Sequence, residues 1–340
     1  MDANGLHQRA CVADAHADSL MWNRDLTQQL SRGHVDFVRL KAAGVKLQCF
    51  TIVTRGFPVL GAFRVFMSYR RWPKPARRSE WVRAIWQIDQ MMDFCERSRG
   101  QVRVAKRRKD LEDNLREGRI SAVLGVEGAH AVEGRIERVG ELFAKGVRFM
   151  SLTHLSNNEL GGSSFPLMPP KRLTTLGRAI LDEMTRLRMA VDVAHASRRT
   201  LKDILSHPTA RLFCSHTGVS GVAPMWRNLS DDALRRIAER GGVVGIIFGT
   251  VYLGGRKIDD LVRHIEHAAN VAGEDAVAFG SDFDGMVPLP RGMNDVRDLH
   301  LLTQALLQRH PERWVEKIIG GNLTRFLADI LGEESLPAPA

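Results

Sequence analysis

Short apolar segments alternate with segments of helical periodicity along the whole chain of 340 residues. Eight segments are apolar or rich in β-branched residues, and each predicts a strand. They are residues 10–15, 45–53, 120–126, 147–153, 189–194, 211–215, 242–249 and 276–280. Continuous apolar runs such as VGIIF are typical of parallel strands that are buried on both faces. The alternation predicts an α/β fold, and eight strand–helix units favour a closed (β/α)₈ (TIM) barrel over an open doubly wound sheet.

Helix signals separate the predicted strands. Apolar residues recur every three or four positions between Trp81 and Cys95. Ser230 and Ser197 each precede an apolar stripe and predict helix N-caps, and Gly241 predicts a helix end. No repeat or linker divides the chain, so we predict one domain over residues 1–332. The end of the chain, 333–340, closes with SLPAPA and is expected to be a disordered tail.

Composition indicates a soluble globular protein, with 44% hydrophobic and 26% charged residues. Neither an apolar run of membrane-spanning length nor the pattern of a signal peptide is found, so a cytoplasmic protein without a membrane anchor is expected. The four cysteines, Cys11, Cys49, Cys95 and Cys214, are scattered without a C-x-x-C pair. Free thiols are therefore expected in preference to disulfides or zinc ligands.

The net charge of +10 is densest in a basic segment, residues 55–78, which holds seven basic residues and no acidic one. Its aromatic residues leave open a patch for nucleic acid or a membrane surface. A solvated, arginine-rich loop over the mouth of the barrel is the interpretation that we favour. A nucleic-acid partner is therefore not expected.

Histidines and carboxylates follow the predicted strands at the points where the strands end. Eight strand ends of about three positions each would hold about one of the 12 histidines by chance, and four are present. The residues concerned are His16, Asp18, Glu127, His154, His195, His216, Asp282 and Asp284. Because barrel active sites are assembled at the carboxyl ends of the strands, these side chains are predicted to share one site.

Imidazoles and carboxylates form the donor set that holds zinc or a similar divalent ion. His16 and Asp18 point to the same face of a strand and can hold one ion, while His195 and His216 can hold a second. Glu127, on the opposite wall, has two oxygens and can bridge the two. A hydroxide between two metal ions about 3.5–4 Å apart is a nucleophile at neutral pH. Asp284, in contrast, precedes a glycine and is interpreted as a turn residue.

The motifs resemble those of the renal or membrane dipeptidase family, which are metallopeptidases of the amidohydrolase superfamily. The resemblance extends from about Val12 to Phe326. It rests on DAHADSL, GVEGAH, LTHLSNN, VDVAHAS, FCSH, RNLSDDALRRIAERGGVVGI, AFGSDFDG and IIGGNLTRF. It implies a zinc-dependent dipeptidase that holds two Zn²⁺ ions per chain and accepts a D-residue at the C-terminal position of its substrate. A homodimer is a further expectation from the family.

The resemblance also assigns roles to single residues. His16 and Asp18 match the ligands of one zinc, His195 and His216 match those of the other, and Glu127 matches the bridging carboxylate.

Substrate and proton-transfer roles follow in the same way. His154 matches the histidine that polarises the substrate, and Arg227 matches the arginine near the substrate carboxylate. Asp282 matches the acid/base aspartate. Tyr252 falls where the family has a tyrosine that contacts the substrate.

Three features depart from the family pattern. HAD replaces HND in the first motif, the segment LSNNELGGSSFPLMPP after His154 lacks a tryptophan and acidic residues common there, and the basic segment is added. The first leaves the metal ligands intact, whereas the other two concern substrate preference. They keep two alternatives open: a related hydrolase of an N-acyl amino acid or a lactam, and a non-enzymatic protein that binds through the basic segment.

Overall fold

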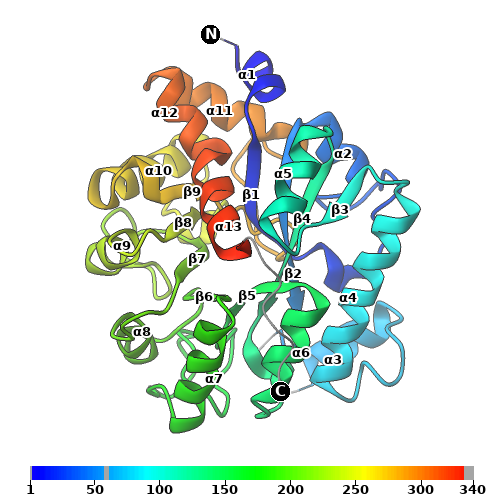
Figure 1. Ribbon diagram of the computed structural model, residues 1–340. Helices are drawn as coiled ribbons and strands as arrows, with labels where there is room; N and C mark the ends of the chain where they lie inside the picture. The colour runs from blue at the N-terminus through cyan, green and yellow to red at the C-terminus, as the bar shows by residue number, and fades with distance from the viewer. Residues whose placement is uncertain (1, 57–60, 333–340) are drawn as a thin grey trace.

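The computed structural model describes residues 2–56 and 61–332. Eight parallel strands form a nearly closed barrel surrounded by helices (Figure 1). In barrel order they are β1 (Val12–Ala17), β2 (Val45–Val53), β4 (Ile120–Glu127), β5 (Val147–Ser151), β6 (Ala190–Asp192), β7 (Leu212–Thr217), β8 (Val243–Ile246) and β9 (Val277–Phe279). A parallel bridge between Ala17 and Phe283 joins the two edges. The predicted (β/α)₈ barrel is confirmed, and each predicted strand overlaps an observed one.

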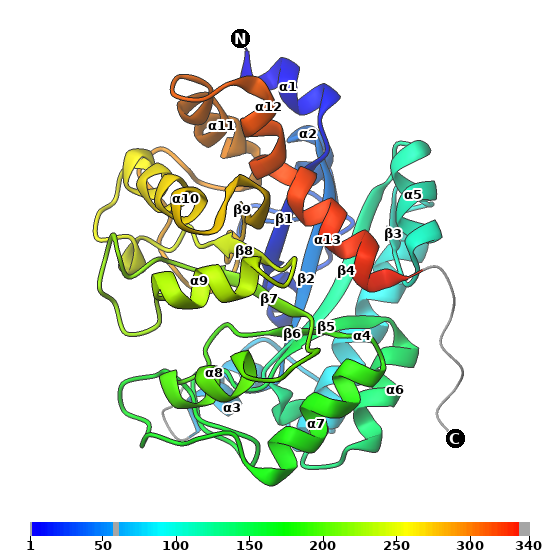
Figure 2. The ribbon, with the colours of Figure 1, turned by 60° about the vertical axis from the view of Figure 1, so that its left-hand side comes forward.

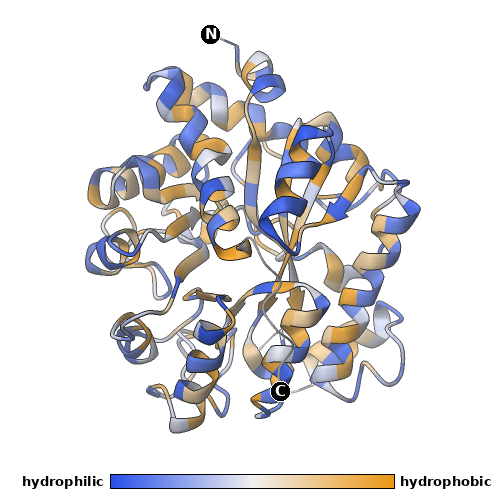
Figure 3. Cartoon of the chain, viewed as in Figure 1, coloured by the Kyte–Doolittle hydropathy of each residue, from blue (hydrophilic) through white to orange (hydrophobic). Residues whose placement is uncertain are grey.

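The helices surround the strands, and hydrophilic and hydrophobic residues are mixed along the helices at the front of the view (Figure 3). They are α1 (Ala3–Arg9), α2 (Phe37–Ala42), α3 (Ala62–Tyr69), α4 (Glu80–Arg97), α5 (Arg108–Arg116), α6 (Glu137–Lys145), α7 (Thr175–Arg186), α8 (Arg198–Leu205), α9 (Asp231–Ala238), α10 (Ile258–Ala272), α11 (Leu299–Leu307), α12 (Glu312–Glu316) and α13 (Asn322–Leu331). Ser197 and Ser230 cap α8 and α9, as predicted, by accepting hydrogen bonds from the backbone of Thr200 and Ala233.

One end of the barrel is closed by α13, which crosses the strands in both ribbon views (Figures 1 and 2). Phe326 stacks on Phe213, and Leu323 and Leu327 are buried in the same cluster as the inward-facing residues Ala13 and Leu47 near the amino ends of β1 and β2. This packing fills the amino end of the barrel and leaves the carboxyl ends of the strands for a site.

The basic segment is not a loop throughout, because α3 lies within it. Phe63 and Met67, one helical turn apart, are buried against Trp72 and Val53, and this apolar face stabilises the helix. The interpretation as a loop was therefore wrong in this part, although Phe63 does line a pocket at the carboxyl ends of the strands. Residues 57–60 lie outside the described part of the chain.

A short strand, β3 (Val102–Val104), was not predicted; it pairs with β4 outside the barrel path. The four cysteines are free, as expected. Within residues 2–56 and 61–332, no helix is long and apolar enough to cross a membrane. The predicted tail, 333–340, lies outside the described residues.

Candidate active site

The predicted site residues meet in one pocket at the carboxyl ends of the strands. His16 lies in β1, Glu127 ends β4 and His216 lies in β7. Four predicted residues follow their strands within three positions, namely Asp18, His154, His195 and Asp282, whereas Tyr252 and Arg227 lie further along the loops after β8 and β7. Eight predicted residues line the pocket, namely Asp18, Glu127, His154, His195, His216, Arg227, Tyr252 and Asp282. His16 is fully buried beside them.

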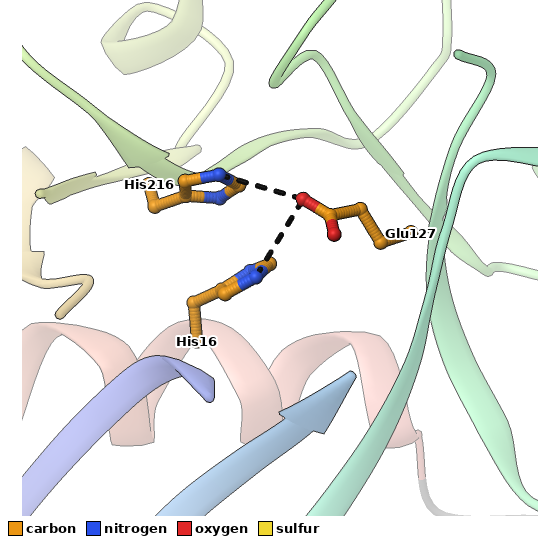
Figure 4. Close-up of side chains that lie close together, drawn as sticks. All are labelled: His16, Glu127 and His216. Carbon is orange, nitrogen blue, oxygen red and sulfur yellow. Dashed lines mark ion pairs between the residues drawn. The ribbon is translucent and has the colours of Figure 1, made fainter. Parts of the chain in front are cut away.

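Glu127 lies at the centre of the cluster. Its Oε1 is 2.9 Å from Nε2 of His195, 3.5 Å from Nε2 of His216 and 3.6 Å from Nε2 of His16. Its other oxygen, Oε2, is 3.3 Å from Nε2 of His154. Figure 4 shows His16 and His216 directed at this carboxylate. Four imidazoles therefore present the same nitrogen to one carboxylate.

Two further carboxylates surround His16. Its Nε2 lies 3.3 Å from Asp18 Oδ1 and 3.9 Å from Asp282 Oδ1. Thr51, on β2, donates a hydrogen bond of 2.5 Å to the same oxygen of Asp18 and so fixes that side chain. Sequence reasoning missed Thr51, because a threonine inside an apolar strand carries no signal of its own.

These donors fit a divalent metal ion. Nε2 of His195 and Nε2 of His216 lie only 3.0 Å apart, and both are directed at Glu127. Oε2 of Glu127 is buried and forms no hydrogen bond with any described residue. Buried polar atoms normally have partners, and nitrogen and oxygen atoms that converge in this way are the ligands of zinc-class ions.

The charges of the cluster support the same conclusion. Burial and the neighbouring Asp18 raise the pKa of Glu127 well above its usual range. Burial also raises the pKa of Asp282 to about 7. Burial acts to lower the pKa of His16, but Glu127, Asp18 and Asp282 outweigh it and raise this pKa to about 10. The cluster thus concentrates negative charge that a bound cation would neutralise.

His154 has a fixed orientation. Its Nδ1 lies 2.7 Å from the carbonyl oxygen of Arg55, which only accepts hydrogen bonds, so Nδ1 carries a proton. Burial lowers the pKa of His154 to about 4, and the resting imidazole is therefore neutral with a lone pair on Nε2. His154 can donate a hydrogen bond to a substrate from Nε2 only when it takes up a second proton.

Arg227 brings a positive charge to the pocket, and this charge acts to lower the pKa values of Glu127 and Asp282. The residue is 6% exposed, and its Nε and Nη1 form no hydrogen bond with the described residues. Its Nη2 donates to the carbonyl oxygen of His216 at 3.1 Å. The guanidinium lies 4.8 Å from the centre of the Tyr252 ring. A buried guanidinium with free donors is suited to binding a carboxylate.

An apolar wall completes the pocket, and sequence reasoning did not find it. Its members come from five separate segments of the chain and are Met21, Val53, Phe63, Leu155, Met286 and Val287. The enclosed volume is about 80 Å³, which is room for several water molecules, since one needs about 10–15 Å³. Phe165, in the segment that departs from the family pattern, contacts Trp226, which contacts Tyr252. That segment is therefore connected to the pocket.

Asp284 is buried but does not line the pocket. Its Oδ2 accepts hydrogen bonds from Ser19 at 2.5 Å and from Arg24 at 2.6 Å, and its Oδ1 accepts one from the backbone of His34 at 2.8 Å. These contacts join the loop after β1 to the loop after β9. They favour the interpretation of Asp284 as a structural residue.

A parallel barrel with imidazoles and carboxylates at the carboxyl ends of its strands defines the class of the barrel metallohydrolases. The family described as membrane dipeptidase (peptidase family M19) matches residues 1–334. The chain belongs to this family, and the resemblance stated from the motifs is confirmed.

Three relatives illustrate the similarity. The dipeptidase aclJ of Aspergillus oryzae is 31% identical over 95% of this chain and 78% of its own length. A metallopeptidase of Rhodobacter sphaeroides, solved with a phosphinate mimic of the dipeptide L-Ala-D-Ala, is 25% identical, with a TM-score of 0.82 over 94% of this chain and 98% of its own. The probable dipeptidase PvdM of Pseudomonas aeruginosa has the same fold, with 18% identity and a TM-score of 0.83 over 97% of each chain.

Proposed function

We propose that this protein is a zinc-dependent dipeptidase with two ions per chain. The observation that carries the proposal is the convergence of imidazole Nε2 atoms on the carboxylate of Glu127. His16 and Asp18 would hold one ion, His195 and His216 the other, and Glu127 both. Such ions supply Lewis-acid polarisation of a carbonyl group and activation of water at neutral pH. Family membership argues against the alternative of a non-enzymatic binding protein.

Arg227 binds the C-terminal carboxylate of the substrate in this proposal. Its free Nε and Nη1 are buried in the pocket wall, where a carboxylate would satisfy both. Tyr252 lies against the same guanidinium and limits the space around it. A carboxylate bound there fixes the distance from the substrate's C-terminus to the scissile amide, and so selects substrates with a single residue after that amide, as in a dipeptide.

Asp282 and His154 move protons. Asp282 takes the proton from the attacking water and gives it to the leaving amine. Its side chain lines the pocket, where it can exchange protons with a bound substrate. His154, held by the carbonyl of Arg55, donates a hydrogen bond from Nε2 to the developing oxyanion once it has taken up a proton from the solvent. The negative charge that forms on the carbonyl oxygen favours the uptake of this second proton by Nε2 of His154.

The apolar wall indicates the class of substrate side chain. Phe63, Met21 and Val287 offer no hydrogen bond to a polar side chain, so dipeptides with apolar side chains are the substrates that we propose. The relative from Rhodobacter sphaeroides binds a mimic of L-Ala-D-Ala, which supports a small C-terminal D-residue as an acceptable one. The same wall favours a second candidate, an N-acyl amino acid whose acyl chain contacts it.

A substrate panel tests these proposals. Zinc-loaded protein is assayed with L-L and L-D dipeptides that carry apolar or charged side chains, and with N-acyl amino acids. We expect the highest kcat/KM with apolar dipeptides. Turnover of N-acyl amino acids alone would replace the first proposal with the second, and no turnover of any amide would contradict both.

A further inference from the structure

One buried hydroxyl contacts two of the proposed metal ligands on the side away from the pocket. Oγ of Ser215 lies 3.0 Å from Nδ1 of His16 and 2.9 Å from Nδ1 of His216. The same Oγ donates a hydrogen bond of 2.6 Å to Oδ2 of Asp192. Ser215 is fully buried and Asp192 is 2% exposed, so water does not compete for these contacts.

The hydrogen-bonding capacity of a hydroxyl determines the direction of each contact. A hydroxyl has one proton and two lone pairs. Because the proton of Ser215 goes to Asp192, its oxygen accepts from both histidines, and both Nδ1 atoms carry protons. With Nδ1 protonated, each imidazole has only Nε2 left as a possible metal ligand, and both Nε2 atoms lie beside Glu127.

Asp192 is itself held in place. Its Oδ1 accepts hydrogen bonds from the backbone N–H groups of Ala194 and Ser215, each at 3.0 Å. The carboxylate therefore presents Oδ2 to the hydroxyl in one orientation. The third proposed histidine ligand lacks such a partner, because Nδ1 of His195 is buried and forms no hydrogen bond among the described residues.

We propose that the Asp192–Ser215 pair is a positioning element that sets the tautomer of His16 and His216, and thereby couples the zinc affinities of the two proposed sites. The inference rests on the proposed function in one respect, the use of these histidines as ligands. It concerns neither the substrate nor the reaction. One hydroxyl serves one ligand of each ion, so its loss acts on both sites.

The variant Asp192→Asn tests the hydrogen-bond logic with little change in volume. The backbone N–H groups of Ala194 and Ser215 donate to Oδ1 of Asp192, so in the variant they hold the amide oxygen of the asparagine at that position. Its NH₂ group then faces Ser215 and donates to the hydroxyl. Ser215 must in turn donate its proton to one of the two histidines, which forces that imidazole into the tautomer protonated on Nε2 and removes it as a ligand.

The experiment measures zinc affinity and tautomers on the full-length chain. Zn²⁺ binding is followed by competition with a chromogenic chelator, and ¹H–¹⁵N multiple-bond correlation spectra of histidine-labelled protein report the tautomers. Ser215→Ala is expected to weaken both zinc sites by roughly 10–100-fold, the usual effect of losing a partner of a metal ligand. Asp192→Asn is expected to show one Nε2-protonated imidazole that the wild type lacks.

Ser121→Ala is the matched control, because Ser121 is a buried serine of a barrel strand whose hydroxyl has no hydrogen-bond partner among the described residues. It should leave zinc affinity and tautomers unchanged. Thermal unfolding of every variant separates loss of fold from loss of metal. Wild-type zinc affinity in folded Ser215→Ala, or unchanged tautomers in Asp192→Asn, would overturn the proposal. Failure of the proposed reaction would leave both measurements intact, so the two outcomes are distinguishable.

Discussion

Asp282 and Asp284 are two residues apart and have opposite surroundings. Both adopt a left-handed backbone, with φ of 60° and 67°, which aspartate tolerates better than most residues. Asp14 holds the start of this turn by accepting hydrogen bonds from the backbone and the hydroxyl of Ser281. The turn directs Asp282 into the pocket and Asp284 into the protein. Their substitutions should therefore affect different properties.

The change Asp282→Asn removes the proposed proton carrier and keeps the shape of the side chain. We expect kcat to fall roughly 10²–10⁴-fold, because a positioned general acid–base contributes about that much. Zinc content should remain that of the wild type, since the proposed ligands are other residues. Steady-state kinetics and elemental analysis of the same preparation check both expectations.

Asp284→Asn is the control for that change. It weakens the contacts to Ser19, Arg24 and His34, and the free energy of unfolding should fall by about 1–3 kcal/mol, the usual cost of leaving a buried polar group without its partner. Turnover by the folded protein should be close to normal. Lost turnover in Asp284→Asn with normal turnover in Asp282→Asn would show that the two aspartates are wrongly assigned.

Arg227→Met tests carboxylate recognition. Losing one member of a buried charge pair should reduce transition-state stabilisation by roughly 2–4 kcal/mol, measured as the ratio of kcat/KM values. Amidation of the substrate's C-terminus should reduce kcat/KM of the wild type by a similar amount and that of the variant far less. Equal losses in the two proteins would indicate that Arg227 supports the loop instead of the substrate.

The imidazoles and carboxylates of the site were predictable from the sequence, whereas the residues that position them were not. Imidazoles and carboxylates at strand ends stand out because the spacing of strands places them at one end of the barrel. Ser215 directly precedes His216, yet nothing in the sequence indicates that its hydroxyl also reaches His16, 199 positions away. Contacts between distant strands depend on the curvature of the closed barrel, which local patterns do not record.

Among the elements, periodicity predicted the long and buried ones. The apolar spacing in 81–95 corresponds to α4, and the run VGIIF includes most of β8. The short β3 has three residues, one of them exposed, and presents no pattern to detect. The helix α3 was not detected because its exposed face carries Val65 and Tyr69 as well as polar residues, so that the buried Phe63 and Met67 do not stand out as an apolar stripe.

The start of α4 depends on a residue from another part of the chain. Oε1 of Glu133 accepts hydrogen bonds from Ser79 Oγ and the backbone of Glu80, both at 2.8 Å, and its Oε2 is 2.6 Å from Arg138. Partial burial acts to raise the pKa of Glu133, but hydrogen bonds from Arg138, Ser79 and the α4 backbone outweigh it and lower the pKa to about 2. The ionised carboxylate thus caps the positive end of the helix.

This cap predicts a pH dependence of stability. A carboxyl whose pKa is depressed in the folded state stabilises it above the unfolded pKa of about 4.5 and loses that contribution as the pH falls toward 2. Because the side chain is partly exposed, the contribution is about 1 kcal/mol. Urea midpoints should fall less between pH 5.5 and 3 in Glu133→Gln than in the wild type. The exposed Glu141, on α6, provides the control Glu141→Gln, whose urea midpoints should change with pH as those of the wild type do. Identical pH profiles for all three proteins would contradict the role of the cap.

The two ends of the barrel have different roles: the amino end stabilises the fold, and the carboxyl end holds the proposed site. The apolar residues of α13 fill the amino end, whereas the carboxyl end gathers three buried carboxylates and four imidazoles. Such a concentration of buried charge lowers stability unless a cation binds there. The metal content of the protein and its resistance to unfolding should consequently change together.

That coupling gives the prediction for the whole molecule. Elemental analysis should find close to two zinc ions per chain, because five ligands with one shared carboxylate suit two ions better than one. Chelation should lower the unfolding midpoint, since each ion at a free concentration of 100 times its Kd stabilises the fold by about 2.7 kcal/mol. Glu127→Gln should weaken both sites together, whereas His216→Ala should chiefly empty one. A single tight ion in fully loaded wild-type protein, or selective loss of one ion in Glu127→Gln, would refute the shared carboxylate, because a bridging ligand cannot be removed from one site alone.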